Sequence, residues 1–389
     1  MTPLRVVAGE SLAERAAAAV KAAADHAETV DREGRFPREA VEALKSARLL
    51  GAMAPPELGG DGASLAEISA LCTTLGGACA STGMIFAMHQ INMANVLDCA
   101  MDSAWHREFI ARSVREQLLF ASATTEAGVG GDLRHSICAV EPQGERFTLA
   151  KAAPVISYGE YADAIFATAR RDPDAPSSDQ VLAVLLRDQY ELERVSTWDA
   201  LGMRGTCSHG YRLKAEAPAE QILPKAFADI AAESMVAVSH LLWSSVWCGI
   251  AADALGRAHA FVASEARKSH GAPPPGAARL ADAYGRFRLL EASIKDRLVE
   301  WETARRAPTL SISLTMNALK VSVSTGALGV VDEALMICGL QGYKNGGPYS
   351  LGRHLRDVHS ARLMIGNDRI LASTGQMLLI QRRPVATGL

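Results

Sequence analysis

Leu118-Leu-Phe-Ala-Ser-Ala-Thr124, followed directly by Thr125-Glu-Ala-Gly-Val-Gly-Gly-Asp132, is the stretch where the pattern of the chain changes. The first seven residues are mostly apolar and predict a β-strand. The next eight contain three glycines, which predict a tight turn that exposes backbone N–H groups. Such a turn suits a phosphate group or the edge of a flavin ring, although a plain hairpin turn has the same composition.

The pattern before this stretch is helical. Ser11-Leu-Ala-Glu14 forms a capping box, in which a serine hydroxyl and a glutamate carboxylate satisfy backbone N–H groups at a helix start. The helices predicted over this part of the chain cover residues 12–30, 38–50, 64–75 and 81–100, with Gly51 ending the second of them. The first third of the chain is therefore expected to be a helical domain.

The pattern after this stretch is first β and then helical again. Short apolar runs at 146–149, 164–168 and 181–186 predict strands of an antiparallel barrel or sandwich. Long helices are then predicted over 226–268, 276–306, 310–340 and 356–382, with a glycine-rich turn at 342–352, and they imply a four-helix bundle. The expected fold is mainly α with a β insert, as three domains: 1–117 helical, 118–224 β and 225–389 helical bundle.

Composition excludes several classes of protein. The chain has 389 residues, of which 49% are hydrophobic and 21% charged, as in soluble globular proteins. The net charge of -3 argues against a nucleic-acid partner. Seven cysteines without a CxxC pair indicate reduced thiols rather than disulfides or a metal site. We find no uninterrupted apolar run of about 18 residues and no signal-peptide core, so we expect no membrane association and a cytoplasmic location.

Standard catalytic motifs are missing from the chain. It contains no GxxxxGK[ST], GxSxG or HExxH motif, and Gly128-Val-Gly130-Gly131 lacks the third spaced glycine of a nicotinamide-binding fingerprint. A second glycine-rich turn, at 339–347, follows a predicted long helix and is longer than helix capping requires. The two turns are thus the candidate binding elements.

Fragments spread over the whole chain resemble the acyl-CoA dehydrogenase superfamily. The matching fragments, in order, are Leu49-Leu-Gly-Ala-Met-Ala-Pro-Pro-Glu-Leu-Gly-Gly-Asp-Gly62, Thr124-Thr125-Glu126 with Gly130 and Asp132, Leu201-Gly-Met-Arg-Gly-Thr206, Arg267-Lys268 with Gly271, and Gly339 to Tyr343 with Leu355-Arg356-Asp357. Each fragment is short, but their order and spacing match the α–β–α organisation.

The resemblance implies a fold, a cofactor and a reaction. It implies FAD held between the β domain and the bundle, usually in a homotetramer. Dehydrogenases of this family abstract an α-proton from an acyl thioester with a glutamate while a β-hydride passes to flavin N5. Related monooxygenases on the same fold use reduced flavin, FAD or FMN, with O2.

The resemblance also assigns residues to the cofactor. Thr124 and Thr125 border the flavin ring, and Val155 and Ser157 fall where the family has W-x-T against it. The other residues implied for cofactor binding are Gly130, Gly131, Arg267, His270, Gly339, Asn367 and Arg369. Asn367 is in addition predicted to cap the helix that begins at Asp368.

The proton-abstracting residue departs from the family pattern. The usual glutamate position holds Ile365, and the alternative position on an earlier bundle helix holds Ser239. Three explanations remain open. In the first, Asp368, the nearest carboxylate, is the base; its other interpretation is an acid that the helix dipole favours at a helix start. In the second, the chain is a monooxygenase that uses His89 and Ser157, although the position of His89 equally predicts a packed or substrate-lining residue. In the third, the chain is a non-catalytic relative.

The sequence therefore predicts an FAD-dependent oxidoreductase. Dehydrogenation of an acyl thioester is the first hypothesis, and a two-component flavin-dependent monooxygenase, using FAD or FMN, is the alternative. The expected partners are a small molecule, carried as an acyl-CoA or acyl carrier protein thioester, and an electron-transfer flavoprotein or a flavin reductase. No metal is expected.

Overall fold

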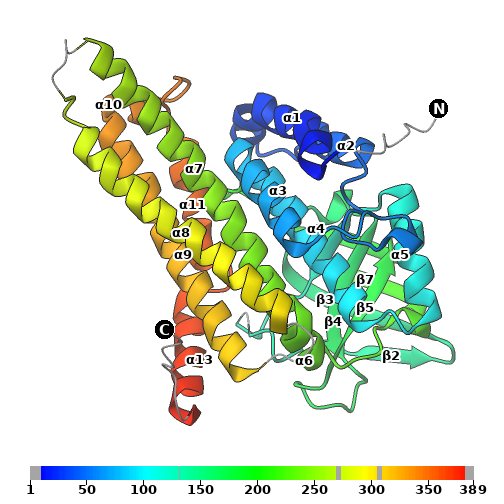
Figure 1. Ribbon diagram of the computed structural model, residues 1–389. Helices are drawn as coiled ribbons and strands as arrows, with labels where there is room; N and C mark the ends of the chain where they lie inside the picture. Colours follow the sequence, from blue (N-terminus) through cyan, green and yellow to red (C-terminus); the bar gives the residue numbers. More distant parts are fainter. Residues whose placement is uncertain (1–9, 131, 269–272, 305–308, 382–389) are drawn as a thin grey trace. The chain divides into compact units, whose positions relative to one another are not determined.

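The computed structural model describes residues 10–130, 132–268, 273–304 and 309–381. The chain divides into two compact units, one built from residues 1–68, 85–200 and 204–239 and the other from residues 69–84, 201–203 and 240–389. Figure 1 shows the helices and strands of both. The order along the chain is helical, then β, then helical, so the predicted fold class is confirmed. The three domain boundaries stay a prediction.

The N-terminal helices begin where their caps predict. Helix α1 (Leu12–Glu33) starts at the Ser11–Glu14 capping box. Helices α3 (Leu65–Ala78), α4 (Ala80–Cys99) and α5 (Ala104–Glu116) follow α2 (Arg38–Ser46). The prediction for α2 was four residues too long: Arg48 has a left-handed φ of 56°, so the chain leaves the helix before Leu50.

The β region consists of two sheets. β1 (Phe120–Ala123), β4 (Ala164–Arg170) and β5 (Gln180–Leu186) form the first, in the order β1-β4-β5. β2 (Val140–Gln143), β3 (Arg146–Ile156), β7 (His209–Pro218) and β6 (Tyr190–Ser196) form the second, which is antiparallel throughout.

The expectation of a wholly antiparallel β domain was wrong at one pair. β1 runs parallel to β4, with Phe120 opposite Ala164. A parallel pair needs a long crossover, and here the chain forms β2 and β3 of the other sheet between the two strands. β4 and β5 are buried along nearly their whole length, so they were recognisable from their continuous apolar runs.

An aromatic cluster forms the core beside the first sheet. The rings of Phe109 on α5 and Phe120 on β1 stack at 5.2 Å between centroids, and Phe166 on β4 lies 5.3 Å from Phe120. All three side chains are buried. This core anchors the first residue of β1, the strand that leads into the candidate binding turn.

The C-terminal region is a bundle of long helices. After α6 (Phe227–Ile230) and a π-helical turn (Ala231–Met235), α7 (Val236–Lys268), α8 (Ala277–Ala304) and α9 (Leu310–Cys338) lie side by side in Figure 1. The single helix predicted over 356–382 is instead divided among the end of α11 (Gly352–Val358), α12 (Ser360–Leu363) and α13 (Asn367–Ile380). The short helix α10 (Leu340–Tyr343) forms within the segment 339–347 that was predicted as a turn. The remaining short 3-10 turns are Pro56–Leu58, Gly159–Tyr161, Arg187–Gln189, Arg204–Thr206 and Ala219–Gln221.

A close approach between α3 and α7 explains two of the glycines. A Cβ added at Gly249 would lie 2.0 Å from the Thr73 carbonyl oxygen, and one at Gly76 would lie 2.5 Å from that of Val246. Only glycine allows two helix backbones to come this near. The end of α3 therefore packs directly on the backbone of α7.

Two helical stretches of the described residues, 227–268 and α9, are long and apolar enough to cross a membrane. Most of the apolar window in the first is buried inside the protein, and less than half of that in the second. Core helices of soluble proteins have the same length and composition, so these stretches are weak indicators of a span. Neither stretch is an uninterrupted apolar run, since each contains polar and charged residues.

Candidate functional site

The turn after β1 is joined to the end of β3. The Thr125 hydroxyl donates to the Val155 carbonyl oxygen at 2.8 Å, and the Ala127 N–H donates to the Ala152 oxygen at 2.9 Å. Thr124, Thr125 and Val155 are all partly exposed. The structure thus brings together two segments that lie about 30 residues apart and that the resemblance assigns to one cofactor edge.

The Glu126 carboxylate holds this turn in place from inside. It accepts hydrogen bonds from the Ser136 hydroxyl at 2.7 Å and from the backbone N–H groups of Ile137 at 3.1 Å and Cys138 at 2.6 Å. The Lys151 ammonium group lies 3.5 Å away and is fully buried. Burial opposes ionisation of Glu126, but these bonds and the Lys151 charge outweigh it, and its pKa lies below the ordinary value.

Glycines at the outer end of the turn adopt a backbone that other residues avoid. Gly128 has a φ of +94° and Gly130 a φ of +59°, and no atom lies within 4 Å of a Cβ added at Gly130. The outer end of the turn is therefore left-handed backbone with space beside Gly130, and Glu126 supports it from inside. Space for a ligand, partly exposed hydroxyls and a rigid support are the properties that a flavin edge requires, so these residues fit the implied cofactor. Gly131 lies outside the described residues.

Ser157 belongs to a row of three hydroxyls. Its Oγ lies 2.8 Å from the Ser208 Oγ, which in turn lies 2.7 Å from the Thr206 Oγ1. Ser157 and Ser208 are buried, with 8% and 4% of their surfaces exposed. The next residue, Tyr158, donates its backbone N–H to the Thr206 oxygen at 2.8 Å, which holds the row together. A proton can be shared along such a row.

His89 links backbone segments. Its Nδ1 accepts from the Phe120 N–H at 3.1 Å, so Nε2 carries the proton and donates to the Leu50 oxygen at 2.8 Å. The ring is completely buried, and burial lowers its pKa to about 4. Both ring nitrogens are thus engaged by the backbone, and neither has a bond left for a substrate.

The turn between α12 and α13 contains the residue at the position of the family base. Ile365 has a φ of 49°, a left-handed conformation that is rare for a β-branched side chain. The Lys320 ammonium group on α9 donates to the Ile365 oxygen at 2.6 Å and to the Asn367 Oδ1 at 2.8 Å. Ser324, one turn along α9, bonds with Asn367 in both directions, at 3.0 and 3.2 Å.

The predicted capping role of Asn367 was wrong. The residue that caps α13 is Gly366, without a side-chain hydrogen bond, and Asn367 is the first residue of the helix. The reason is that the Asn367 amide is held by Lys320 and Ser324 on α9. Asp368 is exposed on the first turn of α13, where a carboxylate is favoured by the helix dipole.

The remaining predicted cofactor residues lie at helix ends. Gly339 joins α9 to α10 with φ 55° and ψ -134°, a conformation that is almost restricted to glycine. Arg369 in the first turn of α13 and Arg267 near the end of α7 are exposed, while His270 lies outside the described residues.

Three residues that support these turns, Lys320, Glu126 and Lys151, were not among the predicted site residues. Lys320 was recognisable, because it is the only charged residue between Leu310 and Val331. A lone charge in an apolar helix must be satisfied inside the protein. The Glu126–Lys151 pair joins residues 25 apart, and no local pattern indicates such a contact.

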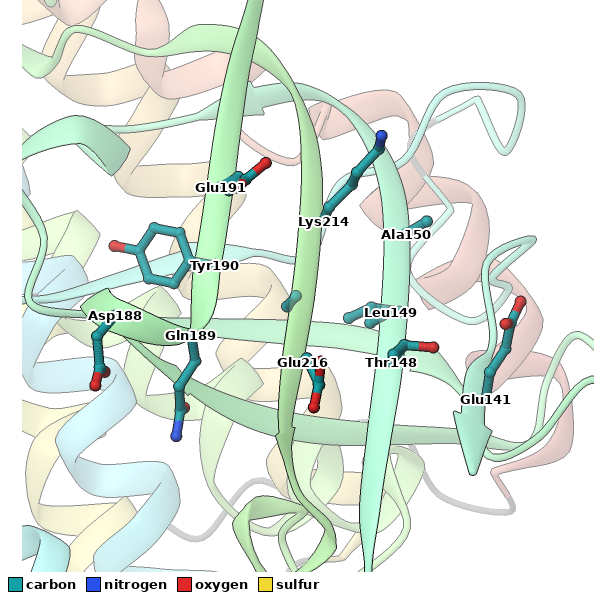
Figure 2. Close-up of a pocket in the computed structure, with 11 residues that line it drawn as sticks. Glu141, Thr148, Leu149, Ala150, Asp188, Gln189, Tyr190, Glu191, Lys214 and Glu216 are labelled. Carbon is teal, nitrogen blue, oxygen red and sulfur yellow. The ribbon is translucent and has the colours of Figure 1, made fainter. Parts of the chain in front are cut away.

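A surface hollow lies on the four-stranded sheet. Figure 2 shows its lining side chains on β2, β3, β7, the 3-10 turn Arg187–Gln189 and the start of β6. Four carboxylates and Lys214 surround it, and the full lining is Glu141, Thr148, Leu149, Ala150, Asp188, Gln189, Tyr190, Glu191, Lys214, Ala215 and Glu216. None of the predicted site residues contributes to this hollow.

Family models match both helical regions of the chain. Residues 10–117 match the N-terminal domain of acyl-CoA dehydrogenases, and residues 230–379 match their C-terminal domain. The chain belongs to the acyl-CoA dehydrogenase superfamily. The resemblance inferred from the sequence is thereby confirmed.

Individual relatives of this superfamily member differ in their chemistry. The chain is 25% identical to cyclohex-1-ene-1-carbonyl-CoA dehydrogenase from Syntrophus aciditrophicus, over 93% of this chain and 87% of that protein. It is 28% identical to L-evernosamine nitrososynthase from a Micromonospora strain, over 92% and 86%. Dibenzothiophene monooxygenase TdsC from Paenibacillus, solved with FMN and indole, shares the fold with a TM-score of 0.82 and 18% identity, over 94% and 96% of the chains.

Proposed function

We propose that this chain is a flavin-dependent oxidoreductase that acts without a carboxylate base, as a monooxygenase supplied with reduced flavin. The observation that carries the proposal is the turn at Ile365. The residue at the family's base position is apolar, and its backbone oxygen accepts a bond from an ammonium group. Among the residues the structure describes, the carboxylate nearest in sequence, Asp368, is exposed.

The turn after β1 supplies the proposed flavin edge. Thr124, Thr125 and Gly130 would border the ring, while the buried Glu126 keeps the turn rigid. In the C-terminal unit, the contacts that the resemblance implies would come from Gly339, Arg369 and Arg267. A bound flavin supplies electron transfer and, when reduced, reaction with O2.

Ser157 is the proposed polar group of the reaction. Its hydroxyl is tied to Ser208 and through it to Thr206, so its hydrogen can be directed either toward or away from a substrate oxygen. This row orients and shares a proton and needs no charged base. His89 does not enter the proposal, since both of its ring nitrogens are bonded to the backbone.

Dehydrogenation of an acyl thioester remains the second candidate. Similarity to a CoA dehydrogenase over 93% of the chain favours it. In that case Asp368 would have to serve as the base. FAD, an electron-transfer flavoprotein and a homotetramer would then be expected, whereas the first candidate calls for a flavin reductase and FAD or FMN.

Anaerobic mixing separates the two reactions. The protein loaded with oxidised flavin is mixed with acyl-CoA thioesters of different chain length and branching, and flavin absorbance is followed. We expect no bleaching. The protein loaded with reduced flavin is then mixed with air-saturated buffer, and we expect its reoxidation rate to differ from that of free flavin. Rapid bleaching by any thioester would establish dehydrogenation and overturn the proposal.

A further inference from the structure

We propose that Lys320 is a positioning residue that holds the α12–α13 turn in the strained shape in which it presents Ile365. The inference rests on contacts within the C-terminal unit and needs the proposed function only for its consequence in catalysis. The turn consists of residues 364–367, and Lys320 reaches it from the middle of α9.

The strain at Ile365 requires a restraint. A left-handed backbone costs a β-branched residue about 1–3 kcal/mol and persists only where neighbouring contacts impose it. The preceding residue, Met364, has φ -68° and ψ 103°, so the chain turns sharply at this point. The 2.6 Å bond from the Lys320 ammonium group to the Ile365 oxygen is a contact of the kind required.

Lys320 holds the turn at two points. Its second bond, 2.8 Å long, ends on the Asn367 Oδ1, two residues beyond Ile365. The Asn367 side-chain amide also donates a hydrogen bond to Ser324, which lies one helical turn further along α9. Two acceptors on either side of Gly366 are therefore fixed by a single side chain, which defines the shape of the turn as well as its position.

The Lys320 ammonium group lies in the protein interior, where burying a charge costs free energy. The Lys320 side chain is fully buried, and its Nζ lies 5.6 Å from the ring centroid of the equally buried Trp247. No carboxylate pairs with it among the residues that the structure describes. Burial lowers its pKa to about 8, and the titratable group facing it from α7 is His240, whose own pKa burial and the nearby Lys320 charge lower to about 4.

Deprotonation leaves the two hydrogen bonds possible but changes their strength. A neutral amine still carries two N–H groups for its two acceptors, whereas the cation–π contact with Trp247 depends on the charge. The positioning therefore weakens, and does not disappear, as the pH rises past about 8. The Trp247 ring reports this step directly.

Tryptophan fluorescence tests the contact without any flavin. We expect the wild-type emission to change in one step centred near pH 8, and both K320M and W247F to lose that step. K295M, which removes an exposed lysine on α8, is the matched control and should keep it. A step that persists in K320M, or no step in the wild type, would overturn the assignment of a charged Lys320 against Trp247.

Hydrogen exchange tests the positioning. In K320M we expect amides of residues 364–369 to exchange at least tenfold faster, with the rest of α13 and α9 changed much less. I365G relieves the strain, so K320M made in that background should accelerate exchange by less than threefold. An equal acceleration in the wild-type and I365G backgrounds would show that Lys320 has a general structural role and does not restrain the strain at Ile365. No acceleration in either background would show that Lys320 does not hold the turn.

A second variant serves if K320M does not fold. N367A removes one of the two acceptors of Lys320, so amides of residues 364–369 should exchange faster in it, by a smaller factor than in K320M. Unchanged exchange in N367A would then overturn the proposal.

Discussion

At the scale of single residues, two buried lysines act as fixed points for the candidate site. Lys151 faces the Glu126 carboxylate under the turn after β1, and Lys320 holds the turn before α13. Each connects segments that are far apart in sequence. The shapes of the turn after β1 and of the α12–α13 turn thus depend on buried charges that come from distant segments of the chain.

Lys151→Met should destabilise the protein by about 3 kcal/mol, because it leaves a buried carboxylate without its countercharge. This expected loss is at the low end of the range for breaking a buried ion pair, because three other hydrogen-bond donors to Glu126 remain. Urea unfolding measures it, with K295M as an exposed control that should stay within about 0.5 kcal/mol. A cost for K151M as small as that of K295M would show that the pair adds nothing.

Glu126→Gln should change the pH dependence of stability. The pKa of Glu126 is lowered in the folded protein, so its contribution is present above the ordinary value of 4.5 and is lost as pH falls through the folded pKa. E126Q should therefore be less stable than the wild type at pH 7, and the gap should narrow in acid below pH 4.5. Unfolding midpoints at several pH values decide this, and a constant gap would contradict it.

Ser157→Ala should lower turnover at least tenfold while leaving stability within about 1 kcal/mol, because Ser208 keeps its bond to Thr206. Oxygen uptake and thermal unfolding give the two readouts. S196A, which alters a structural hydroxyl on β6, is the control and should leave turnover unchanged. Equal turnover in S157A and the wild type would remove Ser157 from the mechanism.

At the scale of elements, most of the helices and the start of β3 follow from the sequence, whereas several helix ends and the rest of the second sheet do not. α8 and α9 were predicted to within a few residues because loops with proline or glycine bound long apolar patterns. The missed strand β7 alternates buried and exposed residues, so its period of two was present but weakened by charges. α2 and α13 departed from prediction because tertiary contacts at Arg48 and Asn367 override the local pattern.

Replacing two glycines of the same region by alanine should change the stability of the protein in opposite directions. Gly339 has a left-handed φ of +55°, so G339A should cost about 1–2 kcal/mol. Gly329 lies within α9 with no atom near its added Cβ, so G329A should gain about 0.5–1 kcal/mol from helix propensity. Thermal unfolding of both variants provides the check. A stabilising G339A would mean that the α9–α10 junction is not held as described.

At the scale of the whole molecule, three buried neutral imidazoles make the protein sensitive to acid. Burial lowers the pKa of His89, His106 and His240 to about 4 from 6.5. Between these values the unfolded chain binds protons that the folded protein does not, so stability falls as pH falls. Between pH 4 and 6.5, each of these imidazoles lowers the free energy of unfolding by up to about 1.4 kcal/mol for every pH unit of acidification.

The melting temperature should therefore drop steeply from pH 6.5 to pH 4.5. H106Q should flatten this dependence, whereas H135Q, at an exposed histidine, should not. A melting temperature that is constant over this range would contradict the burial of neutral rings.

The sequence predicted the family and the fold class, because order and spacing of short fragments survive when each fragment has diverged. It also placed Thr125 and Val155 at one edge, and the structure joins them directly. It did not reveal the contacts around Ile365, the residue at the position of the family's glutamate, since they come from a lysine 45 residues earlier.

The proposed function requires that these residues bind a flavin and use it in the reduced state. Equilibrium titration of the purified protein with FAD and FMN, oxidised and then anaerobically reduced, tests it most directly. We expect at least one reduced flavin to bind tenfold or more tightly than its oxidised form, and E126Q to weaken that binding. Failure to bind either flavin in either state would overturn the proposed function and indicate a relative without flavin chemistry.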